Sequence, residues 1–125
     1  MPSLLIVDDE MGVRESLKMV FAKDYRLLEA ESINAAMPKL LAERPQVVLL
    51  DILMPKTDGI EALKQIKAIH PGCEVIMLTG LNSQQLATTA TEFGAFDFIG
   101  KPFDVMDLRQ KVSKALRAVT QRPPS

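Results

Sequence analysis

The strongest constraint on the fold is a set of four strand-like apolar runs, each of which leads into polar residues. The runs are Leu4–Val7, Val47–Leu50, Val75–Leu78 and Phe96–Ile99. The polar residues that follow them are, in chain order, Asp8 and Asp9, Asp51, Thr79, and Lys101 after Gly100. Runs rich in Val, Ile and Leu are typical of parallel strands that are covered on both faces. Because the carboxyl ends of parallel strands meet at one edge of a sheet, where α/β folds bind ligands, the sequence predicts a single site at that edge.

Helical periodicity fills the stretches between the strands. Apolar residues recur three or four positions apart in four segments, namely Val13 to Phe21, Ile33 to Leu41, Ile60 to Ile69 and Leu108 to Val119. The segment from Gln84 to Phe93 carries only a thin apolar stripe of Leu86, Ala90 and Phe93, so we expect a loosely held helix there. Arg26 to Ala30 is expected to form a short second strand at the edge of the sheet.

Individual residues mark where the predicted helices begin, end or bend. Asp58 and Asp104 can cap the third and fifth helices, and Gly94 suits the end of the fourth. Pro38 removes a backbone hydrogen bond from the second helix, which we therefore expect to start late or to bend.

The alternation of strand and helix, five times over, predicts an α/β fold. Right-handed crossovers place the helices on both faces of the sheet and give a doubly wound (βα)5 three-layer sandwich. The expected architecture is flavodoxin-like, with a parallel sheet of order 2-1-3-4-5. In that order the reversal point lies between the first and third strands, which brings Asp8, Asp9 and Asp51 together.

Composition fits one ordinary intracellular domain. The chain has 125 residues, of which 47% are hydrophobic and 25% charged, and its net charge of −1 gives no bulk attraction to nucleic acid or membrane. The single Cys73 cannot form an internal disulfide, which favours a reducing compartment. The N-terminal apolar run is too short for a signal peptide, and no run approaches membrane-spanning length. We therefore expect a cytoplasmic protein without direct nucleic-acid or membrane binding.

The residue types at the predicted site indicate phosphoryl chemistry. Asp8, Asp9 and Asp51 would repel one another unless a cation joined them, and a dense set of oxygen ligands suits Mg²⁺ better than Zn²⁺. Lys101 adds a compact positive charge and Thr79 a hydrogen-bond donor, which together could neutralise a phosphoryl group in transfer. A carboxylate can itself be the nucleophile. Asp51 is the better candidate, because Asp8 and Asp9 form a pair suited to holding metal.

Each of these residues also has an ordinary structural interpretation. Asp8 and Asp9 could cap the first helix, Asp51 could be a strand-end acid, Thr79 a turn residue and Lys101 a solvated lysine. Their joint placement on four strand ends favours a functional site.

Two further residue types are assigned to structure alone. His70 precedes a Pro-Gly turn with no second metal ligand nearby, so we interpret it as a surface residue. The methionines, Met37, Met54 and Met77 included, are interpreted as core-filling side chains.

Four short motifs in order make the chain recognisable. They are Val7–Glu10, Leu50–Pro55 with Asp58 and Gly59 behind it, Leu78–Gly80 and Gly100–Phe103. From Leu4 to about Val119 the chain resembles the receiver domain of two-component response regulators. On this basis we expect a receiver domain over residues 1–120 and a linker or tail over residues 121–125, after which an output domain could be missing from this chain.

The resemblance implies a role for each site residue. Asp51 would accept a phosphoryl group from the phosphohistidine of a sensor histidine kinase. Asp9, Asp51 and the main-chain carbonyl of Leu53 would bind Mg²⁺ directly, and Asp8 mostly through a water molecule. Lys101 would pair with the phosphoryl group once it is present.

The resemblance also implies a switch. Thr79 would turn toward the phosphoryl oxygen, and Phe98, at the position of the family's switch aromatic, would swing inward. Phe98 has no hydroxyl, so a signal carried by a tyrosine hydroxyl is excluded. The family holds the Lys101–Pro102 bond cis. The change would reach the face formed by the helix at 84–93, the strand at 96–99 and the last helix, which could also form a homodimer.

The expected partners are the sensor kinase and either the chain's own output domain or a downstream effector. The segment from Gly94 to Leu108 is most similar to receivers of enhancer-binding transcription regulators, which predicts a transcriptional output. Leu53 and Leu81 flank the mouth of the site in this fold and cannot hydrogen-bond a water, which predicts slow self-dephosphorylation.

Two other function classes share parts of the pattern. Aspartate-nucleophile phosphatases use Asp, Thr and Lys residues in the same roles. They carry the nucleophile in an Asp-x-Asp arrangement after the first strand, together with a larger cap or substrate pocket. This chain has Asp-Asp at that place and no spare residues for a cap. A pseudo-receiver that only binds partners would be expected to lack one of Asp51, Thr79 or Lys101, and all three are present. We therefore expect a phosphoacceptor switch with self-catalysed reactions only, and not an enzyme acting on an external substrate.

Overall fold

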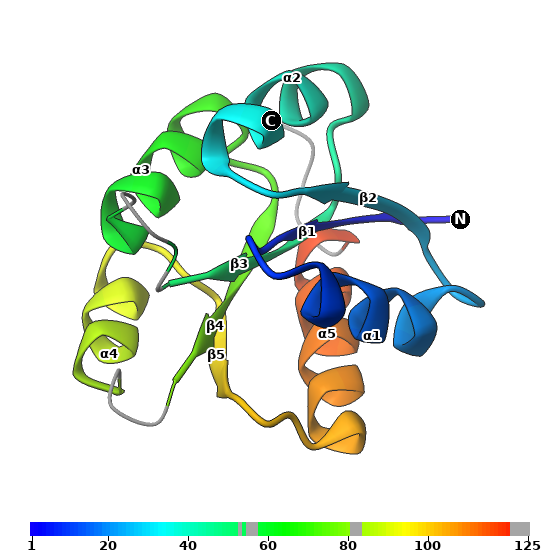
Figure 1. Ribbon diagram of the computed structural model, residues 1–125. Coiled ribbons are helices and arrows are strands. Elements are labelled where there is room, and N and C mark those ends of the chain that lie inside the picture. Colours follow the sequence, from blue (N-terminus) through cyan, green and yellow to red (C-terminus); the bar gives the residue numbers. More distant parts are fainter. Residues whose placement is uncertain (53, 55–57, 81–83, 121–125) are drawn as a thin grey trace.

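The computed structural model describes residues 1–52, 54, 58–80 and 84–120, and these form one five-stranded parallel sheet with five helices (Figure 1). The strand order is β2-β1-β3-β4-β5, as predicted. The elements are β1 Ser3–Val7, α1 Met11–Phe21, β2 Arg26–Ala30, α2 Ile33–Glu43, β3 Val47–Asp51, α3 Gly59–Ile69, β4 Glu74–Thr79, α4 Gln84–Glu92, β5 Asp97–Gly100 and α5 Val105–Thr120. Within these described ranges no helix is both long enough and apolar enough to cross a bilayer.

The sheet separates two cores, because successive side chains of a strand point to opposite faces. On one face, α2, α3 and α4 cover strand residues such as Leu5, Leu50 and Met77. On the other face, α1 and α5 cover the neighbouring residues, such as Leu4 and Leu49. Figure 1 shows the same division, with α1 and α5 together on one side of the sheet. Burial on both faces explains why these strands are apolar without alternation.

The predicted caps of three helices are confirmed. The Asp58 side chain accepts a hydrogen bond from the backbone nitrogen of Ile60 at 2.9 Å, and the Asp104 side chain accepts one from Asp107 at 3.1 Å. Gly94 follows the end of α4 with a φ of 104°, a left-handed conformation that favours glycine.

The predicted late start of the second helix is wrong. The helix α2 begins at Ile33, where the Ser32 side chain accepts a hydrogen bond from the backbone nitrogen of Ala35 at 3.1 Å, and it includes Pro38 in its interior. The Ser32 cap stabilises the first turn of the helix independently of Pro38. The proline lacks a backbone N–H and so removes only one backbone hydrogen bond, later in the helix. The alternative expectation, a bend of α2 at Pro38, stays a prediction.

Helix α4 has a small buried face, in line with the loosely held helix predicted. Ala90 is fully buried, whereas Leu86 and Phe93 are 43% and 46% exposed. The Phe93 ring is covered on one side by the ammonium of Lys64, which lies 4.4 Å from the ring centroid. Met54 and Met77 are buried and Met37 packs against the core, as predicted. Core filling is the wrong interpretation for the other four methionines, Met1, Met11, Met19 and Met106, because their side chains are exposed.

His70 is buried and not at the surface, so that interpretation is wrong. Its Nε2 lies 2.8 Å from the carbonyl oxygen of Pro45, which ties the start of β3 to the end of α3. Its Nδ1 has no hydrogen-bond partner in the described part of the chain. Burial lowers the pKa of His70 and outweighs the hydrogen bond to Pro45, which favours the charged ring.

We expect the free energy of unfolding to depend on the protonation of His70, the one histidine of the chain. Above the ordinary pKa of 6.5 its contribution is fully present, because both states are neutral. As the pH falls below that value, the unfolded chain takes up a proton that the folded ring resists, and stability is lost. The slope for one group is at most about 1.4 kcal/mol per pH unit.

Urea unfolding of the parent and of His70→Gln, from about pH 7.5 to about pH 5.5, measures this loss. The amide of Gln keeps a donor near Pro45 but does not titrate, so the variant should lose less stability over this range. Equal pH slopes in the two proteins would assign the titration to another group.

Gly59, the first residue of α3, lies close to Ile52, the residue that follows β3. A Cβ atom at this position would lie 2.6 Å from the carbonyl oxygen of Ile52, the residue after Asp51. Gly59→Ala should therefore lower the free energy of unfolding by about 1–3 kcal/mol, measured by chemical denaturation.

Gly12→Ala is the matched control for Gly59→Ala. Gly12 lies in α1, and a Cβ there would have nothing within 4 Å. We expect this substitution to leave stability unchanged or to raise it by up to about 1 kcal/mol, because alanine favours the helix. A Gly59→Ala protein as stable as the Gly12→Ala protein would contradict the close approach.

Candidate functional site

Five predicted site residues meet at the carboxyl edge of the sheet. Asp8 and Asp9 follow β1, Asp51 ends β3, Thr79 ends β4 and Lys101 follows β5. The sheet register aligns these strand ends, since Asp51 pairs with Leu78 and Thr79 with Gly100. Backbone hydrogen bonds from Asp8 to Ala30 and from Lys101 to Thr79 continue the pairing beyond the strands.

Four carboxylates form an acidic cluster at this edge. Asp8, Asp9, Glu10 and Asp51 each offer an oxygen, and these four oxygens all lie within 4.8 Å of one another. The Asp8 and Asp51 side chains are buried, whereas Asp9 and Glu10 are exposed. A set of oxygen donors that is open to solvent on one side fits a hard divalent cation that keeps several waters, such as Mg²⁺.

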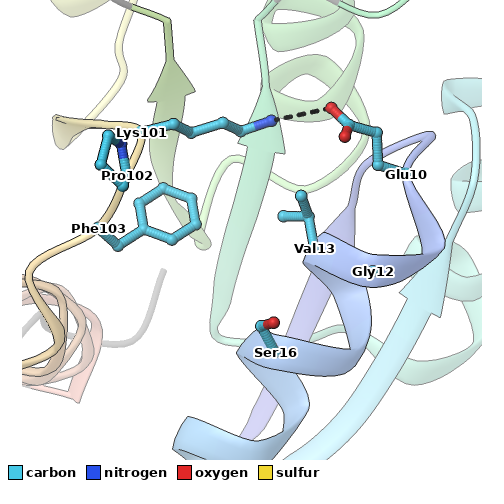
Figure 2. A pocket seen from close by; sticks show the side chains of 7 residues that line it. All are labelled: Glu10, Gly12, Val13, Ser16, Lys101, Pro102 and Phe103. Carbon is cyan, nitrogen blue, oxygen red and sulfur yellow. Dashed lines mark ion pairs between the residues drawn. The ribbon is translucent and has the colours of Figure 1, made fainter.

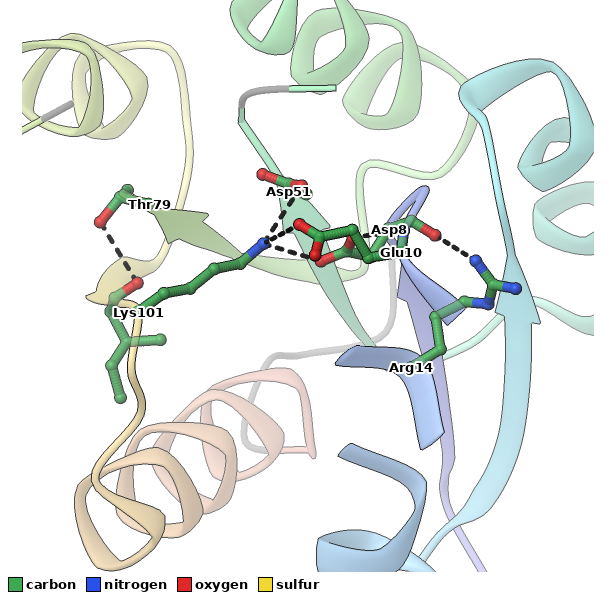
Figure 3. Close-up of polar contacts among 7 residues, drawn as sticks. Asp8, Glu10, Arg14, Asp51, Thr79 and Lys101 are labelled. Atoms are coloured by element: carbon green, nitrogen blue, oxygen red, sulfur yellow. Dashed lines mark hydrogen bonds and ion pairs between the residues drawn. The ribbon is translucent and has the colours of Figure 1, made fainter. Parts of the chain in front are cut away.

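Lys101 inserts its ammonium into the acidic cluster. Its Nζ lies 3.1 Å from Oδ2 of Asp8, 3.3 Å from Oδ2 of Asp51 and 3.8 Å from Oε1 of Glu10 (Figure 3). Burial of the ammonium works to lower the pKa of Lys101, but the hydrogen bond to Asp8 and the charge of Asp51 outweigh it and raise the pKa above its ordinary value. Lys101 is therefore a charged partner of the carboxylates and not a solvated lysine.

Asp8 is held by the loop that joins β1 to α1. Its Oδ1 accepts a hydrogen bond from the backbone nitrogen of Glu10 at 2.9 Å. The N-cap residue of α1 is Glu10, whose own side chain makes no capping hydrogen bond. The alternative interpretation of Asp8 and Asp9 as the cap of α1 is therefore wrong, because neither is its N-cap residue.

Thr79 and Phe98, the two predicted switch residues, lie at the end of β4 and within β5. The Thr79 hydroxyl is buried and donates a hydrogen bond to the carbonyl oxygen of Ile99 at 3.3 Å, so that it points to β5 (Figure 3). Phe98 is half-buried and packs against the core on the α4 side of the sheet. The Lys101–Pro102 bond is cis. Leu53 and Leu81, for which a metal contact and an apolar site mouth were predicted, lie outside the described residues.

Glu10 and Arg14 join the site although the sequence analysis did not single them out. Glu10 adds a fourth carboxylate, and Arg14 donates a hydrogen bond from Nη1 to the main-chain carbonyl of Asp8 at 2.6 Å. A sequence signal for Arg14 did exist: it falls three residues before Leu17 and seven before Phe21, on the buried face of α1. A charged residue on such a face requires a partner.

A cavity of about 380 Å³ adjoins the site between the start of α1 and the segment after β5. Figure 2 shows Val13 and Phe103 on opposite walls, with the ion pair of Lys101 and Glu10 at one end. The carboxylate site therefore opens onto a partly apolar surface hollow.

Comparison with known proteins places these residues in a family. The family model described as the response regulator receiver domain matches residues 4–113. The chain is 39% identical to sporulation initiation phosphotransferase F of Bacillus subtilis over 114 residues. The matched region covers 90% of this chain and 92% of that protein. It is 40% identical over 119 residues to chemotaxis protein CheY of Listeria monocytogenes, covering 94% of this chain and all of that protein.

Solved structures agree with the sequence comparisons. A response regulator receiver domain protein from Clostridium thermocellum superimposes with a TM-score of 0.90 at 28% identity, over 96% of this chain and 98% of that one. NtrX from Brucella abortus superimposes with a TM-score of 0.89 at 30% identity, over 96% of this chain but only 28% of that longer one.

Proposed function

Because this chain belongs to the receiver domain family of two-component response regulators, we propose that it is a signalling switch phosphorylated on Asp51. The observation that carries the proposal is the ion pairing of Lys101 with both Asp51 and Asp8 inside a cluster of four carboxylates. Such an arrangement neutralises the charge that develops on a phosphoryl group during transfer.

In the proposed reaction, an Asp51 carboxylate oxygen attacks the phosphorus of a phosphohistidine on a sensor histidine kinase. The new oxygen–phosphorus bond forms as the phosphorus–nitrogen bond breaks, and the imidazole nitrogen keeps the electron pair. Lys101 Nζ, already 3.3 Å from Asp51, stays close enough to pair with an oxygen of the transferred group. The Asp51 side chain is nearly buried, which limits competing attack by bulk water.

The same site is proposed to hold Mg²⁺ through Asp9, Asp51 and the main-chain carbonyl of Leu53, with Asp8 acting mostly through water. When bound, this ion would offset the negative charge of the incoming phosphoryl oxygens. Asp8 keeps one oxygen for the backbone of Glu10 and the other for Lys101, which is consistent with an indirect role.

The proposed output pathway starts at Thr79. Its hydroxyl would leave the carbonyl oxygen of Ile99 and turn to the phosphoryl group, and Phe98 would move inward with it. The change would reach the face formed by α4, β5 and α5, where the small buried face of α4 offers little resistance to a shift. This face would contact an output domain, an effector or a second copy of the chain.

A transcriptional output is the proposed end point, in the cytoplasm and without direct nucleic-acid binding by this domain. The support is that regulatory protein AtoC of Escherichia coli, 38% identical over 115 residues, and the NtrC protein of Proteus hauseri, 35% identical over 112 residues, are among its relatives. The chain spans about a quarter of each.

Incubation with acetyl phosphate and Mg²⁺, followed by intact-mass measurement, tests the proposed function. A mass increase of one phosphoryl group that depends on Mg²⁺ is the expected result. Rapid release of inorganic phosphate over many turnovers, without an adduct, would favour a phosphatase. No reaction with either acetyl phosphate or a panel of histidine kinases would favour a pseudo-receiver.

A further inference from the structure

Arg14 is a buried cation that contacts the main chain of the site. Its Nη1 donates to the main-chain carbonyl of Asp8 at 2.6 Å (Figure 3), and its side chain is only 9% exposed. The peptide nitrogen of Asp8 still pairs with Ala30 in β2 at 3.1 Å, but the chain then leaves the sheet. The guanidinium therefore donates the hydrogen bond that this carbonyl group no longer receives from the sheet.

The guanidinium of Arg14 is itself held from β2. Its Nε donates to Oε1 of Glu29 at 3.0 Å, and the other oxygen of Glu29 forms an ion pair with Lys18, one turn further along α1. Hydrogen bonds from Lys18 and Arg14 lower the pKa of Glu29, so this carboxylate remains charged in neutral solution. The α1 helix, the edge strand and the end of β1 are therefore joined through one side chain.

These contacts fix Asp8 at four separate atoms. Its backbone nitrogen is bound by Ala30, its carbonyl by Arg14, its Oδ1 by Glu10 and its Oδ2 by Lys101. Of the four, the Arg14 contact holds the carbonyl group from which the chain continues to Asp9 and Glu10. Asp8, Asp9 and Glu10 are consecutive and supply three of the four clustered carboxylates.

We propose that Arg14 is a positioning residue for the acidic cluster, which raises its affinity for Mg²⁺ by fixing the loop of Asp8 and Asp9 through the bridge to Glu29. This inference rests on the proposed function, because it concerns the metal of the same site. The bridge needs two donors in a fixed geometry, one for Asp8 and one for Glu29. The planar guanidinium provides them, whereas the ammonium of a lysine is a single point of charge.

Calorimetric titration with Mg²⁺ in the absence of any phosphodonor tests the proposal. Arg14→Lys should weaken Mg²⁺ binding by roughly 10- to 100-fold, as is typical for residues that orient metal ligands. Glu29→Gln leaves Arg14 in place and removes the charge that orients it, so a smaller loss of about threefold is expected. If Arg14→Lys does not fold, Glu29→Gln carries the test.

Arg26→Lys is the matched control. Arg26 lies at the other end of the same edge strand and bridges Ser3 and Glu43, far from the acidic cluster. This variant can lose stability but should bind Mg²⁺ as the parent does. Melting in EDTA measures the purely structural cost of each substitution, and the Mg²⁺ dissociation constant is compared well below every melting temperature.

The outcomes separate the inference from the function on which it rests. Parent-like Mg²⁺ affinity in both Arg14→Lys and Glu29→Gln would overturn the positioning role while leaving the proposed function intact. An equal loss of affinity in Arg26→Lys would also overturn it, because a general loosening of the edge strand would then explain the effect. A parent protein that binds no Mg²⁺ at all would refute the proposed metal site, and the inference with it.

Discussion

Asp51→Asn is expected to abolish phosphorylation by acetyl phosphate or by a histidine kinase. The amide has no anionic oxygen with which to attack phosphorus, so the loss should be complete and not partial. Intact-mass measurement after incubation with acetyl phosphate and Mg²⁺ gives the result directly. Asn has nearly the shape of Asp, and we expect the variant to remain folded.

Asp97→Asn is a suitable control for Asp51→Asn. It makes the same chemical change on β5, where Asp97 pairs with Lys111 at 3.0 Å and takes no part in the acidic cluster. This variant should gain a phosphoryl group as the parent does. A phospho-adduct at parent yield in Asp51→Asn would move the acceptor to another residue and refute the assignment.

Mg²⁺ is expected to raise the free energy of unfolding of the parent, and Asp9→Ala should erase that increase. The unfolded chain has no assembled cluster, so the ion binds only the folded state and stabilises it by mass action. At a free concentration of one hundred times the dissociation constant, the gain is about 2.7 kcal/mol. Thermal unfolding with Mg²⁺ and with EDTA measures the difference.

Without metal, Asp9→Ala should melt at or above the temperature of the parent. The substitution removes one of four neighbouring carboxylates and so reduces their mutual repulsion. Asp24→Ala, which removes an exposed acid at the far end of α1, controls for the change in net charge. It should keep the full response to Mg²⁺. An equal rise in melting temperature for Asp9→Ala and the parent would show that the metal site had been placed wrongly.

The apolar runs and the residues behind them were sufficient to predict the sheet and the location of its site. Buried parallel strands require continuous apolar sequence, and the helices between them require apolar residues three or four positions apart. Both patterns can therefore be recognised in the sequence. Once the strand order is known, the residues at the strand ends must meet at one edge. Asp8, Asp51 and Lys101 could therefore be assigned to one site before any contact was seen.

Local rules also predicted the caps at Asp58 and Asp104, because a cap involves residues only two or three positions apart. They failed for the start of α2, which was expected to lie later because of Pro38 but lies at Ile33. There, one missing hydrogen bond was outweighed by a well-capped first turn.

Contacts between distant residues were decided by the tertiary structure alone. His70 is buried because the segment around Pro45, 25 positions away, lies against it. The residues next to His70 in the sequence do not predict this contact. Arg14 in helix α1 is oriented by Glu29 on strand β2, 15 positions away. The ion pair of Lys101 with Asp8 spans 93 positions and raises the pKa of the lysine. The chain by itself determined which elements form and which residues reach the common edge, because these depend on local periodicity. Which charged side chains are buried, and which groups they contact, depended on packing between helices and strands. These contacts join residues that lie far apart in the sequence, so local periodicity does not predict them.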